Sequence, residues 1–153
     1  MTTVDQLRGH EWCRVAEDTA ALAAHHAIRR AVFVAEQALF SGSDRDVHDD
    51  DPATVHVVGL AGGAAAGTVR LYPLGGGLWK GDRLAVLAAH RTGSLGGTLV
   101  RFAVATAAAR GGERMIASVQ AGNERFFHRL GWSSLGGPVP YLGMPHVLME
   151  IPL

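Results

Sequence analysis

Residues 84–97 combine the features of a phosphate-binding turn. An apolar stretch from Leu84 to Ala89 runs into Arg91-Thr92-Gly93-Ser94-Leu95-Gly96-Gly97. A helix that begins here would present unpaired backbone N–H groups and the positive end of its dipole to an anion. The glycines would let a phosphate approach the backbone closely, and Arg91 could add a charge-assisted hydrogen bond. The pattern predicts an anion site, although a strand–helix turn that binds nothing has the same local sequence.

Two better-known kinds of nucleotide site are disfavoured. The chain contains no Gly-Lys-Ser or Gly-Lys-Thr triplet, which excludes a Walker A loop. The Gly-x-Gly-x-x-Gly fingerprint of dinucleotide-binding folds is not matched in this segment either.

Composition restricts the possible partners. The 153 residues carry 14 Lys and Arg against 14 Asp and Glu, and this zero net charge argues against broad nucleic-acid or membrane-surface binding. Cys13 is the single cysteine, so an intramolecular disulfide and a cysteine-based zinc site are excluded. His48-Asp49-Asp50-Asp51 lacks the spacing of a calcium-binding loop, so we expect an exposed acidic turn and no metal site. Without a signal-peptide pattern or a membrane span, the expected location is the cytoplasm.

The elements that must position the anion site can be read from hydrophobic spacing. A first strand over 12–16 precedes a helix capped by Asp18 or Thr19, on which His25 and His26 are expected to be half exposed. Alternating apolar residues and glycine-rich turns predict an antiparallel meander over roughly 54–87. A helix to Arg110, a strand over 115–119, a short helix over 123–130 and closing strands follow. This order predicts an α/β (α+β) fold around a mixed sheet.

The anion-binding segment resembles the acetyl-CoA pyrophosphate loop of the GNAT superfamily. The superfamily pattern is Gln/Arg-x-x-Gly-x-Gly/Ala, and the chain has Arg91-Thr92-Gly93-Ser94-Leu95-Gly96, with Ser94 at the position of the first glycine. If Ser94 needs a positive φ, the backbone must be strained there.

Other segments resemble the superfamily in the same order along the chain. Arg29–Gln37 resembles the Arg-x-x-Val-Phe-Val-x-Glu-Gln helix of ElaA-like proteins, and Gly143–His146 resembles their Gly-Ile-Pro-His. Asn123–Trp132 resembles the superfamily's Asn…Phe-Tyr-x-x-Leu-Gly-Phe stretch. A bacterial GNAT subfamily described as nitrogen-starvation-linked is more similar still, over most of the chain after about Ala24. The segments that carry this likeness are Glu36–Phe40, Asp44–Asp46, Gly67–Leu71, Leu78–Val86 and Phe126–Trp132.

The resemblance implies a single acyltransferase domain over 1–153, with helices flanking a mostly antiparallel sheet and a splayed central strand pair. It implies acetyl-CoA as the acyl donor, bound partly in the gap between those strands, and no metal. The implied cofactor-binding residues are Ala85, Val86, Leu87, Arg91, Thr92, Gly93, Ser94, Leu95, Gly96, Gly97, Asn123, Phe126 and Phe127.

The resemblance also implies direct N-acyl transfer to a small amine, with three candidate catalytic residues. Glu36 borders the acceptor side as a base or ammonium ligand, or else forms an ion pair with Arg29 or Arg83. His146 is a base that titrates near neutral pH or a structural histidine bonded to a carbonyl. Gln120 ends a core strand and bonds either backbone or substrate in the cleft.

Phe127 is the largest departure from the superfamily pattern, because a tyrosine that protonates the departing thiolate usually stands there. An acyl-CoA-binding module with a regulatory role and little turnover is therefore the alternative to an enzyme. Autoinducer-type synthesis has only the Arg-x-x-Val-Phe motif in its favour. The acceptor amine stays undetermined, and a homodimer is compatible with the sequence.

Overall fold

The computed structural model describes residues 10–153, and a mixed sheet of eight strands forms its centre. The strands are β1 (Glu11–Val15), β2 (Val55–Ala61), β3 (Ala64–Gly75), β4 (Leu78–Val86), β5 (Arg114–Gln120), β6 (Ser133–Ser134), β7 (Val139–Tyr141) and β8 (Met144–Pro152). Their order in the sheet is β1-β2-β3-β4-β5-β8-β6, with β7 also paired to β8. Among these strands, β4 and β5 are parallel and the other pairs are antiparallel, which confirms the predicted sheet.

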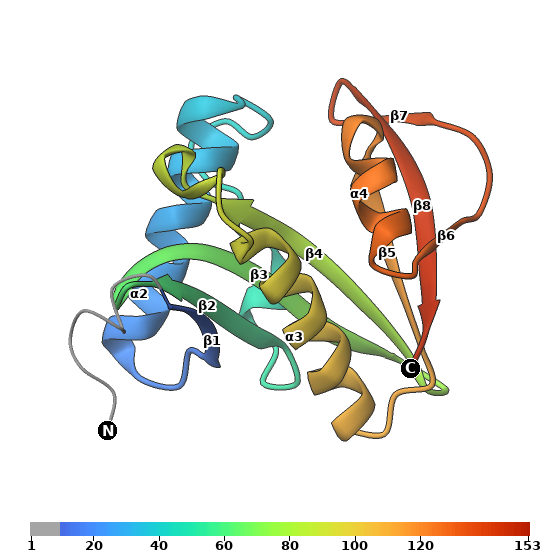
Figure 1. Cartoon of the computed structure of the whole chain (residues 1–153), viewed down its shortest axis with the longest axis horizontal. Coiled ribbons are helices and arrows are strands. Elements are labelled where there is room, and N and C mark those ends of the chain that lie inside the picture. Colours follow the sequence, from blue (N-terminus) through green and yellow to red (C-terminus); the bar gives the residue numbers. More distant parts are fainter. Residues whose placement is uncertain (1–9) are drawn as a thin grey trace.

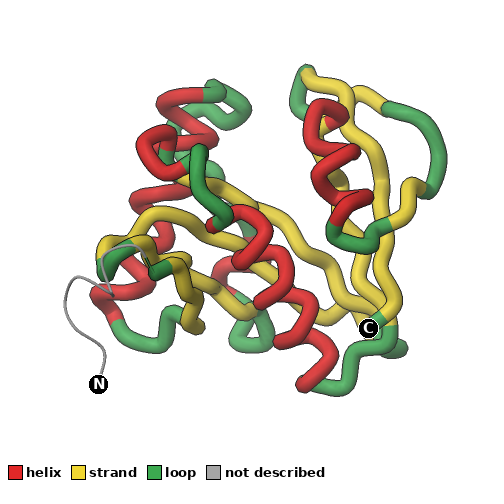
Figure 2. Tube along the Cα trace, in the orientation of Figure 1, coloured by secondary structure: helices red, strands yellow, loops and turns green. Residues whose placement is uncertain are grey.

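Helices lie on both sides of this sheet (Figures 1 and 2). The helical elements are α2 (Thr19–Arg29), the π-helix η1 (Arg30–Glu36), η2 (Val47–Asp50), η3 (Ala88–His90), α3 (Leu95–Ala109), η4 (Ala121–Asn123) and α4 (Glu124–Arg129). Asp18 caps α2 as predicted, and its Oδ1 accepts a hydrogen bond from the Ala21 amide at 2.7 Å. No helix in the described part of the chain is long and apolar enough to cross a membrane.

Helix α3 packs in front of β2, β3 and β4 in Figure 1, whereas α2 and η1 lie behind them. Leu95 and Leu99 of α3 are completely buried. Gly67 permits this close approach, because a Cβ there would lie 2.8 Å from Leu99 Cδ1 and 2.9 Å from the Ala85 carbonyl oxygen. The glycine in β3 therefore helps to fix the start of α3 beside the end of β4.

The two central strands separate soon after they meet. β4 and β5 pair only where Leu78–Lys80 lies beside Arg114–Ile116, and beyond this point they diverge (Figure 1). A bulge in β4 coincides with the divergence, since Arg70 opposes Asp82 and Thr68 opposes Ala85. Arg83 in this bulge has a φ of +53°, and its carbonyl accepts a hydrogen bond from the Thr68 hydroxyl at 2.9 Å. The predicted splayed strand pair is confirmed.

Behind the sheet, a buried ionic network corrects the expectation of an exposed acidic turn at one residue, Asp49, whereas Asp50 and Asp51 are exposed as predicted. The side chain of Asp49 is only 4% exposed and accepts hydrogen bonds from the fully buried Arg29 at 2.7 and 3.1 Å. Arg29 also donates to Asp44 at 2.7 Å. Asp49 and Asp44 are thus counter-ions of the buried Arg29, because a buried guanidinium without a carboxylate would be strongly destabilising.

His25 also differs from expectation, because it is completely buried and not half exposed. Its Nδ1 lies 2.9 Å from the Val57 carbonyl oxygen and its Nε2 lies 3.2 Å from Arg29 NH1. The carbonyl can only accept and the guanidinium can only donate, so the ring is neutral with its proton on Nδ1. Desolvation, with smaller contributions from Arg29 and two other histidines, lowers the pKa of His25 to about 3.

Candidate active site

A basic pocket lies at the N-terminus of α3, where the sequence predicts an anion site. Three arginines line it, and no acidic residue of the described chain is among its lining residues. The guanidinium groups come from Arg91 before α3, Arg101 within α3 and Arg129 at the end of α4. The remaining lining residues are Val86, His90, Gly93, Ser94, Gly96, Gly97, Phe126 and Leu130. Backbone amides and three guanidiniums form a donor set suited to phosphate groups.

Ser94 takes the place of a glycine in this loop without backbone strain. Its φ is −104°, an ordinary value for any residue, so the strain considered from the sequence is absent. Its amide and hydroxyl both donate to Glu11 Oε1, at 3.0 and 2.7 Å. The carboxylate of Glu11 therefore already satisfies donors at the start of α3.

Glu36 lies beside this pocket and pairs with Arg91, not with Arg29 or Arg83. The two terminal nitrogens of the Arg91 guanidinium donate to the two carboxylate oxygens of Glu36 at 2.5 and 2.6 Å, and Nε donates to the Val86 carbonyl at 2.9 Å. The hydrogen bonds from Arg91 hold the pKa of Glu36 below its ordinary value. Arg29 and Arg83 are instead bound to Asp44, at 2.7 and 3.1 Å.

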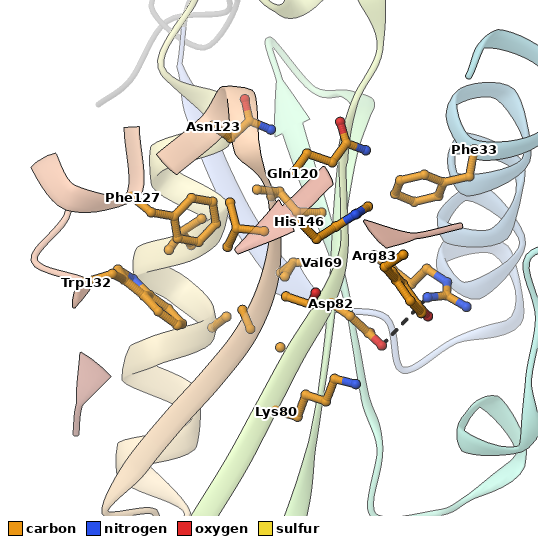
Figure 3. Close-up of a pocket in the computed structure, with 18 of the residues that line it drawn as sticks. Phe33, Val69, Lys80, Asp82, Arg83, Gln120, Asn123, Phe127, Trp132 and His146 are labelled. Atoms are coloured by element: carbon orange, nitrogen blue, oxygen red, sulfur yellow. Dashed lines mark ion pairs between the residues drawn. The ribbon is translucent and has the colours of Figure 1, made fainter. Parts of the chain in front are cut away.

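The divergence of β4 and β5 opens a cavity of about 130 Å³ that passes between the two strands. Figure 3 shows Phe127 and Trp132 on one side of it, and Phe33 and Arg83 on the other. More of its wall is apolar than polar, and its polar lining residues are Lys80, Asp82, Arg83, Ser118, Gln120, Asn123, Tyr141 and His146. Such a concave, largely apolar site with a few polar groups is typical of a ligand-binding cleft.

Gln120 and His146 lie opposite each other in the register of β5 and β8, and both line the cavity. Gln120 Nε2 donates to Gln37 Oε1 at 3.1 Å, so it bonds a side chain beyond η1 and not the backbone. His146 is 4% exposed, and its Nδ1 lies 2.9 Å from the Met144 carbonyl oxygen. That contact requires a proton on Nδ1 and leaves Nε2 of the neutral ring as the proton acceptor.

Phe127 is buried in an aromatic cluster, with its ring centroid 5.3 Å from that of Trp132 and 5.6 Å from that of Phe126. Both interplanar angles, 81° and 82°, correspond to edge-to-face packing. Of the described residues that line the cavity, Tyr141 carries the one phenol, and its ring lies 5.1 Å from His146.

The implied cofactor-binding residues lie in three groups. Thr92 and Leu95 belong to the loop and first turn beside the basic pocket but do not line it, and the Leu95 side chain is completely buried in the core. Asn123 and Phe127 line the cavity, whereas the Ala85 side chain does not, because it is buried against Ile28, Val32 and Phe33. Leu87 is already hydrogen-bonded through both backbone groups, since its amide donates to Ala66 and its carbonyl accepts from His90, each at 2.8 Å.

A cluster of His26, Asp49 and His56 places three metal-ligand atoms within 4.8 Å of one another. However, Asp49 Oδ1 already contacts Arg29 at 2.7 Å and His56 at 3.0 Å. A metal cation bound to Asp49 Oδ1 would share that oxygen with the buried, positively charged guanidinium of Arg29. This arrangement fits an ion-pair network better than a metal centre.

The comparisons with known proteins agree with this geometry. The sequence model of the acetyltransferase (GNAT) family matches residues 15–132. The chain belongs to the GNAT family. A candidate N-acetyltransferase from Lactobacillus plantarum superposes with a TM-score of 0.83 at 26% identity, over 95% of this chain and 99% of that chain. Escherichia coli ElaA superposes with a TM-score of 0.78 at 20% identity, over 92% and 97% of the two chains.

A third GNAT-fold structure, an aminoglycoside 6'-N-acetyltransferase complexed with coenzyme A, gives a TM-score of 0.74 at 14% identity over 92% of this chain and 96% of that chain. At this identity the likeness shows the fold alone. A search of curated protein sequences gives no match. The GNAT family is an acyltransferase family, and the substrates of this member depend on the residues of its own site.

Sequence reasoning missed Arg101, Arg129, Gln37 and Tyr141. Arg101 could have been found, because it follows Gly97 by four residues and so lies on the same face of α3. Gln37 ends the ElaA-like segment Arg29–Gln37, so that motif could have indicated it. Arg129 and Tyr141 come from elements whose position beside the cleft depends on the folded sheet, and no local pattern indicates their place in the site.

Proposed function

We propose that this GNAT family member transfers an acetyl group from acetyl-CoA directly to the amine of a small molecule. The observation that carries the proposal is the proximity of two sites, which are lined by neighbouring residues of β4 and α4. The basic pocket at α3 includes Val86 and Phe126, and the cavity between the strands includes Leu84 and Phe127. An elongated ligand with a phosphate end and an apolar arm can occupy both.

The donor side would use different groups for the two ends of acetyl-CoA. Arg91, Arg101, Arg129 and the amides of the first turn of α3 would hold the phosphates through charge-assisted hydrogen bonds. The arm would then lie along β4 in the cleft, where β5 has moved away. The aminoglycoside acetyltransferase solved with coenzyme A shares this fold, which supports a CoA-type donor.

The acceptor would approach from the side of η1. Glu36 at the end of η1, the Gln37–Gln120 hydrogen bond and His146 lie at or beside this opening. Figure 3 shows Gln120 and His146 next to each other, with the His146 ring directed toward Phe33. These groups could hold an ammonium or hydroxyl substituent and remove a proton from the amine.

In the reaction, the amine nitrogen forms a bond to the thioester carbon and the carbon–sulfur bond breaks. Glu36, His146 Nε2 or a water molecule would accept the amine proton. The CoA thiolate would take a proton from a group other than Phe127, and Tyr141 is the phenol in the lining. Backbone donors of β4 would stabilise the oxyanion of the tetrahedral intermediate.

The test is a transfer assay with an amine panel and acetyl-CoA, in which both free CoA and the acetylated amine are measured. We expect equal amounts of the two products with at least one small amine. Release of CoA without an acetylated amine would indicate hydrolysis and contradict the proposal.

The alternative, an acyl-CoA-binding module with little turnover, is favoured by one observation. Phe127 is 6% exposed and packed between two aromatic rings at the position where a phenol is expected. Tight acetyl-CoA binding with no product from any amine would support this alternative.

A further inference from the structure

We infer that the acceptor of this protein is an amine that also carries a carboxylate, and that Lys80 binds this carboxylate on the η1 side of the cleft. The inference rests on the proposed acyl transfer and specifies the class of acceptor. It makes Lys80 a specificity-determining residue, distinct from the groups proposed to bind the donor.

The side chains of β4 show on which side of the sheet Lys80 lies. Trp79 packs in the core that α3 covers, and a Cβ at Gly81 would lie 3.4 Å from the sulfur of Met115 in the same core. Because successive side chains of a strand point to opposite faces, Lys80 and Asp82 point away from α3. Figure 3 shows both directed toward the side of α2 and η1. The basic pocket for the donor is at α3, so Lys80 lies on the acceptor side.

Lys80 is the one charged residue in the described wall of the cleft that has no counter-ion. The other two charged lining residues are Asp82 and Arg83. Both carboxylate oxygens of Asp82 accept hydrogen bonds from Arg70, at 2.8 and 2.6 Å. Arg83 donates to the carboxylate and the carbonyl of Asp44, at 3.1 and 2.8 Å. In the part of the chain that the structure describes, no carboxylate forms an ion pair with the Lys80 ammonium.

The surroundings of Lys80 do not replace a counter-ion. Its side chain is partly buried, and its register partners are Tyr72 in β3 and Ile116 in β5, neither of which is a charged residue. A partly desolvated ammonium gains from a carboxylate that enters the cleft with a ligand. Lysine presents a compact charge with three rotatable donors on a flexible stem, which suits a carboxylate that comes and goes with the substrate.

The two ends of this face would hold the two groups of the acceptor. Lys80 lies where β4 and β5 still pair, whereas Gln120 and His146 lie where these strands have separated. The amine would lie beside Gln120 and His146, and the carboxylate beside Lys80. The number of atoms between amine and carboxylate therefore determines which acceptors fit, and the test varies it.

The experiment compares the transfer rate for amino carboxylates with that for their neutral amides, using acetyl-CoA as the donor. The pairs are glycine and glycinamide, β-alanine and β-alaninamide, and 4-aminobutanoate and its amide. For at least one pair, Lys80→Met should lower the acid-to-amide ratio of kcat/KM about tenfold or more, because a hydrogen bond to a charged group is lost. Lys80→Arg should keep most of the ratio. Since ratios are compared between proteins, differences in amine basicity and in donor binding cancel.

Arg114→Met is the matched control. Arg114 is exposed on β5 at the same end of the strand pair, opposite Leu78, and it does not line the cleft. Loss of this positive charge should leave the acid-to-amide ratio unchanged. A ratio that Arg114→Met lowers as much as Lys80→Met does would overturn the inference, because the general charge of the protein would then be responsible.

A second measurement needs no turnover. Lys80 is the single lysine among the 14 Lys and Arg residues of the chain. Isotope-labelled reductive methylation therefore gives one lysine signal in NMR spectra, identified by its absence in Lys80→Arg. With free CoA bound, so that no transfer can occur, an amino carboxylate that fits should shift this signal, and its amide should not.

Equal acid-to-amide ratios in the parent and in Lys80→Met for every pair, with a Lys80 signal that no acid shifts, would overturn the inference and leave the proposed function intact. Absence of any acetylated amine would instead contradict the proposed function. The Lys80 signal would then still decide the inference, since a shift by an acid but not by its amide supports it and no shift overturns it.

Discussion

The carboxylate of Glu36 and the guanidinium of Arg91 form two hydrogen bonds, of 2.5 and 2.6 Å, across 55 residues of sequence. One partner ends η1 on the acceptor side and the other begins the predicted phosphate loop. Both side chains are about 40% exposed, so the pair is accessible to ligands. A pyrophosphate that binds Arg91 would compete with Glu36, and the freed carboxylate would then be available to an amine.

Replacement of Glu36 by glutamine should impair catalysis more than donor binding. The change keeps size and hydrogen-bonding capacity but removes the charge, and loss of a general base typically costs about 100-fold or more in rate. Acetyl-CoA affinity should not fall, because Arg91 becomes free to bind phosphate. The melting midpoint should hardly change, since exposed ion pairs contribute little to stability. Turnover, donor affinity and melting are measured on the one variant, and full turnover would exclude Glu36 as a catalytic residue.

Replacement of Glu11 by glutamine should strengthen acetyl-CoA binding. The Glu11 carboxylate accepts hydrogen bonds from the Ser94 amide and hydroxyl, so its negative charge lies at the start of α3. Removing one such charge near a phosphate is expected to improve affinity by a few-fold, about 0.3–1 kcal/mol. Titration calorimetry at low and high salt gives the result, with the gain smaller at high salt. Weaker binding by the variant would show that Glu11 supports the loop more than it repels the donor.

Substitution of Phe127 by tyrosine should preserve folding and should not lower the rate of acyl transfer. The phenol would add the proton donor usual in the GNAT superfamily at a position that lines the cleft. Tyr141→Phe is the companion variant, and a lower rate there, rescued by Phe127→Tyr, would identify Tyr141 as the acid in the parent. A marked loss of rate in Phe127→Tyr with donor binding intact would instead show that the site is matched to a different proton donor.

Acid should destabilise the protein before its carboxylates begin to titrate. Desolvation lowers the pKa of the His25 ring to about 3 in the folded state, against an ordinary value of 6.5. Between these values the unfolded chain binds a proton that the folded chain does not, so the free energy of unfolding falls as the pH falls. The slope for one such histidine is up to about 1.4 kcal/mol per pH unit below pH ~6.5. His26, whose pKa is lowered to about 4 mainly by desolvation, acts in the same direction.

Denaturant unfolding at several pH values between 7 and 4.5 measures this slope. His25→Asn keeps a donor near the position of Nδ1, so the variant should be less stable at pH 7 but less sensitive to acid. A slope that is unchanged in His25→Asn would show that other groups cause the acid sensitivity.

The sequence predicted the parts of this molecule that depend on local patterns. The strand–turn–helix order around Ser94 and the antiparallel meander follow from spacing over a few residues, and both are confirmed. The cap at Asp18 is likewise a local property.

Side-chain contacts between residues far apart in the sequence could not be predicted from local patterns. The burial of Asp49 against Arg29 and the pairing of Glu36 with Arg91 depend on which elements the sheet brings together. The π-helix at η1 was also not predicted, although its widened turn, in which the Gln37 amide bonds the Val32 carbonyl, ends beside the cleft. Only the folded structure shows these contacts, because no local pattern in the sequence indicates which distant charged residues will lie side by side.

The binding of acetyl-CoA to the parent protein and to Gly96→Glu tests the central claim most directly. A Cβ at Gly96 would lie 3.6 Å from Phe126 and 4.0 Å from Val86, so a side chain fits and would enter the phosphate pocket. Acetyl-CoA at 100 times its dissociation constant should stabilise the parent by about 2.7 kcal/mol. Gly96→Glu should lose this shift, and Gly96→Gln, of equal size but neutral, should lose less of it. A midpoint that acetyl-CoA leaves unchanged in the parent, or an equal shift in Gly96→Glu, would contradict the assignment of this loop as the acyl-CoA site.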